Sequence, residues 1–242
     1  MAEVDVEQLL TTSEEPVLRH FLDHRRARRA WVASRAVVVE QTGRGDTAPL
    51  VVALGPHADL APLLAAVAEE SARPGRVIVD ASAADAVPVP WRLEDPRAWF
   101  WMTTTGPLPP VATDDVHELS DLAQVDALLD DAAPHSHTRP ATAGAESWLG
   151  CHDGDRLVSA GALTRRASGA GHLGGIVTAA SHAGRGLATA VTAALTDQAL
   201  GSGPGLATLG VYTDNTVAIG VYHRLGYRTE RTFVSGAVAA AP

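Results

Sequence analysis

The stretch GHLGGIVTAASHAGRGLAT, residues 171–189, carries the strongest structural signal in this sequence. It starts with an extended apolar run, passes through a glycine-rich turn and leads into an apolar helix. Gly184 and Gly186 lack a Cβ atom, so the backbone N–H groups of the turn can close on an anion. A helix that begins near Leu187 adds unpaired N–H groups and the positive end of its dipole. The stretch therefore predicts a strand, a turn and a helix that together bind a phosphate-bearing cofactor.

The sequence on both sides of this stretch alternates between strand and helix patterns. In the expected helices apolar residues recur three or four positions apart, as they do on one face of a packed helix. Such an order is typical of a layered, mixed α/β sheet with some antiparallel pairing. The expected elements are strands at 116–119, 148–151, 157–163, 172–178, 206–212 and 228–238, and helices at 122–132, 187–200 and 216–225, the last capped by Asp214 or Asn215.

A proline-rich connector, GPLPP at 106–110, precedes this half of the chain. Proline removes backbone donors and stiffens the chain, so we expect a boundary here between two packed domains, 1–110 and 113–242. The expected elements of the first domain are helices at 14–31 and 58–71 and strands at 36–40, 50–54, 76–80 and 99–104.

Composition restricts the classes of protein that are possible. The 242 residues carry a net charge of −9, which argues against a general nucleic-acid binder. We interpret the basic cluster at 25–29 as a solvated helix face. No lysine is present, which excludes Schiff-base chemistry on lysine and the lysine-dependent P-loop. With one cysteine, no apolar run of membrane-spanning length and no visible secretory signal, we expect a cytoplasmic protein without a disulfide or multi-cysteine metal site.

Two segments together resemble the signature of the GNAT superfamily of N-acetyltransferases. The first is SHAGRGLAT at 181–189, and the second is YTDNTVAIGVYHRLGYR at 212–228. The resemblance covers 113–242 and implies an α/β (α+β) fold with a mixed, mostly antiparallel sheet flanked by helices. It also implies that acetyl-CoA is the cosubstrate and that its acetyl group moves to a primary amine by direct attack.

In that family the first segment binds the pyrophosphate of acetyl-CoA, and the second supplies an Asn near the cofactor and a Tyr near its sulfur. Asn215 and Tyr222 match these two positions, which makes Tyr222 the candidate general acid. On helical spacing alone Tyr222 would instead be a core residue. The strand before the turn splays from its neighbour in the family, leaving backbone groups for the thioester and the pantetheine amides. The implied cofactor-binding residues are Ile176, Val177, Thr178, Gly184, Arg185, Gly186, Leu187, Ala188, Thr189 and Asn215.

One position departs from the family pattern. Ser181 stands where the family usually has Gln or Arg, three residues before the first turn glycine. Its hydroxyl reaches less far, and Arg185 could supply compensating charge to a phosphate. This departure leaves a second function open, an acyl-CoA-binding regulatory module without turnover. A dinucleotide-binding fold is disfavoured because Thr189 replaces the third glycine of its fingerprint and Asp214 comes too late for its acidic residue.

Several other residues are candidates for chemistry. His172, at the start of the cofactor-facing strand, could act as general base, since histidine titrates near neutral pH; an exposed strand-end histidine is the alternative. Glu146 is a second candidate base. His135 and His137 lack a third nearby ligand, so we expect no metal site and interpret them as loop residues. We expect Cys151 to be a small buried residue rather than an acyl carrier.

The first domain has two interpretations. Its strand and helix order loosely repeats that of the second, and GPH at 55–57 precedes a helix with only one glycine, so it could be a degenerate copy of the same fold. It could also be an unrelated, substrate-shaping domain. We expect a small-molecule or peptide amine as acceptor, and no nucleic-acid or membrane partner. The sequence leaves open which amine is used and whether the chain forms a homodimer.

Overall fold

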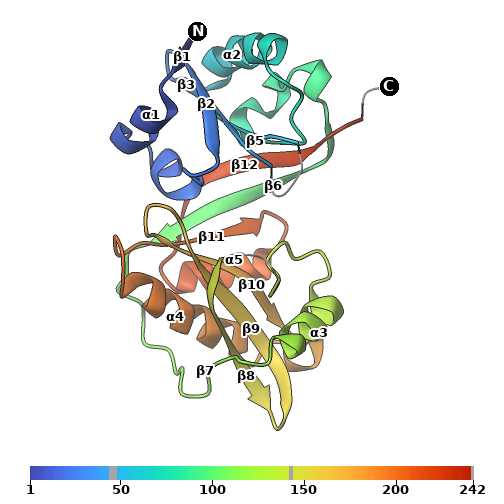
Figure 1. The fold of residues 1–242 in the computed structure, drawn as a ribbon. Coiled ribbons are helices and arrows are strands. Elements are labelled where there is room, and N and C mark those ends of the chain that lie inside the picture. Colours follow the sequence, from blue (N-terminus) through green and yellow to red (C-terminus); the bar gives the residue numbers. More distant parts are fainter. Residues whose placement is uncertain (44–47, 142–143, 241–242) are drawn as a thin grey trace. The chain divides into compact units, whose positions relative to one another are not determined.

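The computed structural model describes residues 1–43, 48–141 and 144–240, which form two compact units (Figure 1). Unit 1 comprises 1–100 and 231–242, and unit 2 comprises 101–230. The boundary falls inside two strands, β6 (Leu93–Thr104) and β12 (Arg228–Val238), so both strands supply residues to both units. The proline-rich connector at 106–110 follows β6 and lies within unit 2.

Unit 1 contains a mixed sheet. Its strands pair antiparallel with their neighbours except for β4 and β5, which pair parallel. A parallel pair needs a crossover, and the helix between these two strands provides it. In spatial order the strands are β1 (Ala2–Val4), β2 (Ala27–Ala33), β3 (Ala36–Gln41), β4 (Leu50–Leu54), β5 (Arg76–Asp80) and β12.

One long helix covers this sheet. In α2 (His57–Glu70), Leu60, Leu63, Leu64 and Val67 are buried, as their helical spacing predicts. They pack with strand residues into one apolar core that includes Trp31. The remaining helical segments of unit 1 are short: α1 (Val6–Thr12), a π-helical turn at Val17–Phe21, and 3-10 turns at Ala81–Ala86 and Val89–Trp91.

The predicted helix at 14–31 is wrong. The chain forms only the turn at Val17–Phe21 and then enters β2. Pairing with β3 and burial of Trp31 outweigh the helix propensity of the arginine-rich segment. The basic cluster is therefore not a helix face: Arg29 lies in β2, where it pairs with Glu3 and stacks its guanidinium 4.4 Å from the Trp31 ring centroid.

The strands of unit 2 also pair in a mixed pattern, and here the predicted order of strands and helices is confirmed. Neighbouring strands pair antiparallel except β10 and β11, which are parallel. In spatial order the strands are β7 (His117–Glu118), β8 (Ala145–Asp153), β9 (Arg156–Arg165), β10 (Gly171–Thr178) and β11 (Ala207–Tyr212). The helices are α3 (Leu122–Ala132), α4 (Leu187–Leu200), α5 (Thr216–Arg224) and a 3-10 turn at Ala180–His182.

Two segments cover opposite faces of β10. A Cβ atom added to Gly171 would lie 2.4 Å from Cβ of Ala199 in α4, and one added to Gly174 would lie 2.5 Å from Oγ1 of Thr138. Positions 171 and 174 point to opposite faces of a strand. Helix α4 therefore packs on one face, and the loop after α3 packs on the other. The predicted class, a mixed and mostly antiparallel sheet flanked by helices, is confirmed.

Candidate functional site

Strands β10 and β11 are paired over only part of their length. Their register covers Gly171 to Leu173 of β10, opposite 207–209 of β11, and then ends. On the other side of β10 the register with β9 shifts between Gly174 and Val177, which marks a bulge. The backbone groups of 174–178 that face away from β9 are thus outside the described ladder. Amide groups of a ligand can pair with them.

Gly175 lies inside the bulge, at a position where only glycine fits without strain. Its φ is +62°, a region that other residues rarely adopt, and an added Cβ atom would lie 2.9 Å from Cη2 of Trp148. Trp148 is 3% exposed. Its indole therefore supports the bulged backbone from one face, a role that nothing in the sequence indicated.

The glycine turn follows β10 directly. Gly184 and Gly186 have φ of +76° and +82°, and a Cβ atom added to either would meet nothing within 4 Å. The turn is thus open on the side where a Cβ atom of either glycine would project. Gly186 is the N-cap of α4, and among the residues that the structure describes no side chain caps this helix. The first N–H groups of Leu187, Ala188 and Thr189 accordingly have no side-chain acceptor, as an anion site requires.

Four polar side chains form a network on the rim of this turn. The Ser181 hydroxyl lies 2.9 Å from Nδ1 of His182, and Nε2 of His182 donates to Oδ2 of Asp153, also at 2.9 Å. Nη1 of Arg185 lies 3.9 Å from the same carboxylate oxygen. The hydrogen bond from His182 lowers the pKa of Asp153, as do the positive charge of this histidine when it is protonated and, to a smaller degree, Arg185. Asp153 ends β8, 28 positions before Ser181, so no local sequence pattern predicts this contact.

Helix α5 positions Asn215 and Tyr222. Asn215 is the N-cap, and its side chain accepts a hydrogen bond from the Ala218 N–H at 3.1 Å, which decides between the two predicted caps. Tyr222 lies in the last turn and is 7% exposed. Burial raises its pKa to about 12, so the hydroxyl stays protonated and can donate a hydrogen bond. Within the described part of the chain no hydrogen bond of this hydroxyl is recorded.

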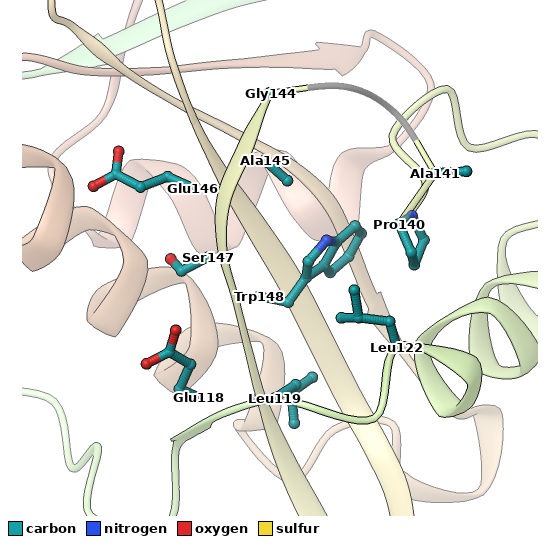
Figure 2. A pocket seen from close by; sticks show the side chains of 10 residues that line it. All are labelled: Glu118, Leu119, Leu122, Pro140, Ala141, Gly144, Ala145, Glu146, Ser147 and Trp148. Atoms are coloured by element: carbon teal, nitrogen blue, oxygen red, sulfur yellow. The ribbon is translucent and has the colours of Figure 1, made fainter.

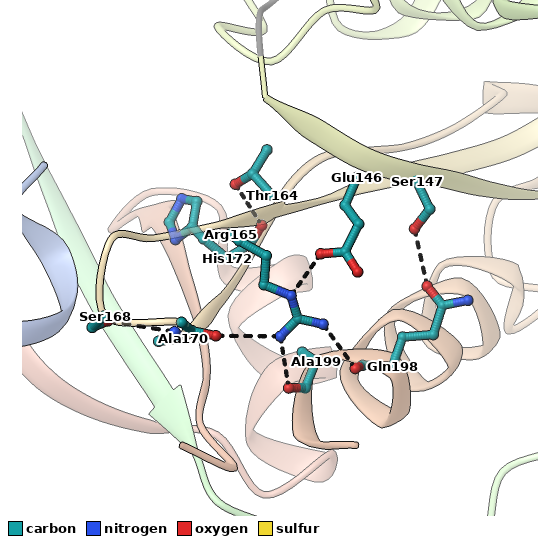
Figure 3. Close-up of polar contacts among 10 residues, drawn as sticks. Glu146, Ser147, Thr164, Arg165, Ser168, Ala170, His172, Gln198 and Ala199 are labelled. Carbon is teal, nitrogen blue, oxygen red and sulfur yellow. Dashed lines mark hydrogen bonds and ion pairs between the residues drawn. The ribbon is translucent and has the colours of Figure 1, made fainter. Parts of the chain in front are cut away.

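The two candidate bases lie in different surroundings. His172 belongs to the paired part of β10, and its Nδ1 lies 2.9 Å from Oγ1 of Thr208 on β11. Glu146 forms an ion pair with Arg165 at 2.6 Å, and Arg165 also donates to the carbonyl groups of Gln198 and Ala199 (Figure 3). These carbonyls end α4, so Glu146 lies at the opposite end of that helix from the glycine turn.

The remaining sequence candidates are not brought together into a site. His135 and His137 lie exposed in the loop after α3, and the described residues contain no cluster of three or more metal-ligating side chains. Cys151 is 2% exposed, and burial raises the pKa of its thiol. A buried, protonated thiol is a poor nucleophile.

A separate pocket of about 360 Å³ lies at the beginning of β8 (Figure 2). It is lined by Glu118, Leu119, Leu122, Pro140, Ala141, Gly144, Ala145, Glu146, Ser147 and Trp148. Asp153, which contacts the glycine turn, lies at the other end of the same strand. The pocket is therefore separated from the turn by most of the length of β8. Through Trp148 it adjoins the bulge of β10.

Part of the chain matches a known protein family. Residues 113–227 match the model of the acetyltransferase (GNAT) family, whose members are acetyltransferases. A comparison with curated proteins found no match. In the described part of the chain no helix is both long and apolar enough to cross a membrane.

Solved structures of similar fold cover most of the chain. A GCN5-related N-acetyltransferase from Sphaerobacter thermophilus has a TM-score of 0.59 at 19% identity, over 92% of this chain and 84% of its own. A second GCN5-related N-acetyltransferase, from Kribbella flavida, has a TM-score of 0.58 at 21% identity, over 90% of this chain and 91% of its own. A GNAT-family acetyltransferase from Colwellia psychrerythraea has a TM-score of 0.58 at 11% identity, over 99% of this chain and 100% of its own. These likenesses show the fold alone, and the family match identifies residues 113–227 of this chain as a GNAT acetyltransferase domain.

Proposed function

We propose that this protein is an N-acetyltransferase that moves an acetyl group from acetyl-CoA to a primary amine. The observation that carries the proposal is the order of structural features along β10 and the segment that follows it. The ladder between β10 and β11 ends after Leu173, and an open glycine turn and an uncapped helix follow. A ligand with amide groups at one end and phosphates at the other matches this order.

The residues of this chain fit acetyl-CoA in two places. The N–H groups of the turn and of the first turn of α4, at 184–189, bind the pyrophosphate, and Arg185, which is 58% exposed at its side chain, can turn toward it. The backbone of 174–178, including Ile176, Val177 and Thr178, pairs with the pantetheine amides. Asn215 caps α5 and fixes the start of the helix that carries Tyr222.

Acetyl-CoA supplies the acetyl group as a reactive thioester, and the transfer forms a C–N bond and breaks a C–S bond. Backbone N–H groups at the bulge of β10 donate to the carbonyl oxygen, where negative charge develops. Tyr222 donates a hydrogen bond or its proton to the departing sulfur. His172, directly or through water, accepts the proton that the amine loses.

The acceptor is a small-molecule or peptide amine. The net charge of −9 attracts cationic amines through long-range electrostatics, although it does not select one cationic amine over another. The roles that we propose for the backbone N–H groups, Tyr222 and His172 do not require a metal ion.

The test is to incubate the purified protein with acetyl-CoA and a broad panel of amines while thiol release is followed. We expect turnover with at least one amine and acetylated product by mass spectrometry. Binding of acetyl-CoA without turnover on any amine would favour the second candidate, an acyl-CoA-binding regulatory module. Absence of binding would refute both.

For unit 1 we propose a structural or substrate-shaping role without a cofactor of its own. Its parallel pair β4–β5 is in register from Leu50 to Ala53, so these strands do not separate as β10 and β11 do. The N–H of Gly55, in the turn before α2, donates to Oδ2 of Asp80 at 2.7 Å. Asp80 is 5% exposed. In unit 1 a buried carboxylate thus accepts the hydrogen bond from the N–H of the turn before α2. In unit 2 the corresponding turn before α4 is open.

A further inference from the structure

The network on the rim of the glycine turn contains a histidine, His182, held between two polar side chains. His182 has a side chain only 12% exposed, with Ser181 at Nδ1 and Asp153 at Nε2. The charged groups that the structure places near it are Asp153, which ends β8, and Arg185, which lies within ion-pair distance of Asp153. Histidine is the side chain that gains or loses a proton between pH 5 and 8.

The hydrogen bonds define two states of this network. A carboxylate only accepts, so Nε2 of His182 carries a proton in both states. When His182 is neutral, Nδ1 accepts and the Ser181 hydroxyl donates to it. When His182 is protonated, Nδ1 donates to the Ser181 oxygen, and the hydroxyl proton of Ser181 turns away from the ring. In that second state Ser181 can donate to a phosphate oxygen.

We propose that His182 takes up a proton from solvent when the phosphates of the cofactor bind, and that Ser181 then donates its hydroxyl hydrogen to them. The inference rests on the proposed function, because it assigns the phosphates to this turn. The phosphates favour a cation beside them, and Asp153 holds the imidazolium in place through Nε2. A charged histidine and a short hydroxyl together take the place of the longer polar side chain that is absent at 181.

Asp153 is a positioning residue in this proposal. Its carboxylate repels phosphate and acts only through His182 and Arg185. We assign no nucleophilic role to Ser181, although a serine, a histidine and an aspartate are adjacent. The turn receives the phosphates, whereas the thioester pairs with β10.

The experiment is isothermal titration calorimetry with CoA at pH 7.5 in two buffers that differ in ionisation enthalpy. The difference in observed enthalpy gives the number of protons taken up per CoA bound. At pH 7.5 the phosphates of CoA are almost fully ionised, because the second pKa of a phosphate monoester is about 6. We expect the wild type to take up a substantial fraction of a proton and to bind more tightly as the pH falls from 8 to 6.5.

Three variants separate the roles. His182→Gln should abolish proton uptake and weaken CoA binding about tenfold, whereas Ser181→Ala should weaken binding but keep the uptake. Asp153→Asn should reduce the uptake. The matched control is His152→Gln, which removes an exposed neighbouring histidine and should change neither quantity.

Equal enthalpies in the two buffers for the wild type, or undiminished proton uptake in His182→Gln, would overturn the inference and leave the proposed function intact. A wild type that binds no CoA would overturn the proposed function together with it. Thermal unfolding of each variant confirms that the protein is folded in the titration.

Discussion

Two tyrosines five residues apart have different surroundings. The Tyr227 hydroxyl lies 2.8 Å from Oγ1 of Thr196, and both groups are buried in unit 2. The Tyr222 ring lies 6.0 Å from the Tyr227 ring, but its hydroxyl has no recorded hydrogen bond in the described part of the chain. The hydrogen bond with Thr196 therefore accounts for the Tyr227 hydroxyl, whereas the Tyr222 hydroxyl can donate to a bound ligand.

Tyr222→Phe should lower kcat about 100-fold, because the sulfur loses its donor, while the temperature of unfolding stays the same. In the wild type kcat should not fall near pH 10, where an ordinary tyrosine ionises, because burial raises the pKa of Tyr222 to about 12. Thiol release against pH measures both effects.

Tyr227→Phe is the matched control for this variant. It breaks the hydrogen bond to Thr196 and should lower the free energy of unfolding by about 1 kcal/mol without changing kcat. If the two variants had equal kcat, Tyr222 would have no part in the reaction.

Gly186→Leu should weaken CoA binding by roughly 100-fold, because the side chain projects into the space that the phosphate needs. The positive φ adds backbone strain of about 1–2 kcal/mol, so the protein becomes less stable but stays folded. Gly205→Leu is the control: it carries the same kind of strain at φ +64°, beyond the C-terminal end of α4. Titration with CoA should show unchanged affinity only for the control.

At the scale of the element, α4 is held at its two ends in different ways. Its N-terminus has no side-chain cap from the described part of the chain, whereas its C-terminal carbonyls accept hydrogen bonds from Arg165, which Glu146 orients (Figure 3). The helix has 14 residues, which corresponds to a length of about 21 Å. The side chains that hold α4 therefore lie at its C-terminal end, away from the N–H groups that we propose bind the phosphates.

Arg165→Met should therefore lower the free energy of unfolding by about 2 kcal/mol, and the unfolding temperature by about 4–8 °C, without weakening CoA binding. Calorimetric unfolding and a CoA titration measure the two quantities. Arg228→Met, at an exposed position, is the control and should leave both unchanged. A large loss of CoA affinity in Arg165→Met would contradict the assignment of the two helix ends.

At the scale of the whole molecule, the two units use a parallel strand pair and a crossover helix in different ways. In unit 2 the pair separates and the turn is open; in unit 1 the pair stays in register and Asp80 takes the Gly55 N–H. Burial raises the pKa of Asp80, since Arg231 and the Gly55 N–H offset its desolvation only in part.

One chain should therefore bind one CoA. Native mass spectrometry or calorimetry measures this number, and Asp80→Asn should leave it at one. A second, independent CoA per chain that Gly186→Leu does not remove would show that unit 1 also binds the cofactor.

Much of unit 2 follows from local sequence. Glycine at 184 and 186 allows positive φ values, apolar spacing places α3 and α4, and Asn215 caps α5. These features depend on neighbouring residues, so the sequence alone predicts them. The first part of unit 1 was predicted less well, because β2 exists only through its pairing with β1 and β3.

By itself, then, the sequence determined the glycine turn, the helix after it and the resemblance to the family. Tertiary structure decided where the ladder of β10 and β11 ends, that Trp148 packs against the bulge, and that Asp153 meets His182. It also decided that β12 is shared between two units. The physical reason is range: a turn or a cap is fixed by adjacent residues, whereas strand register and side-chain pairs join residues far apart in the chain.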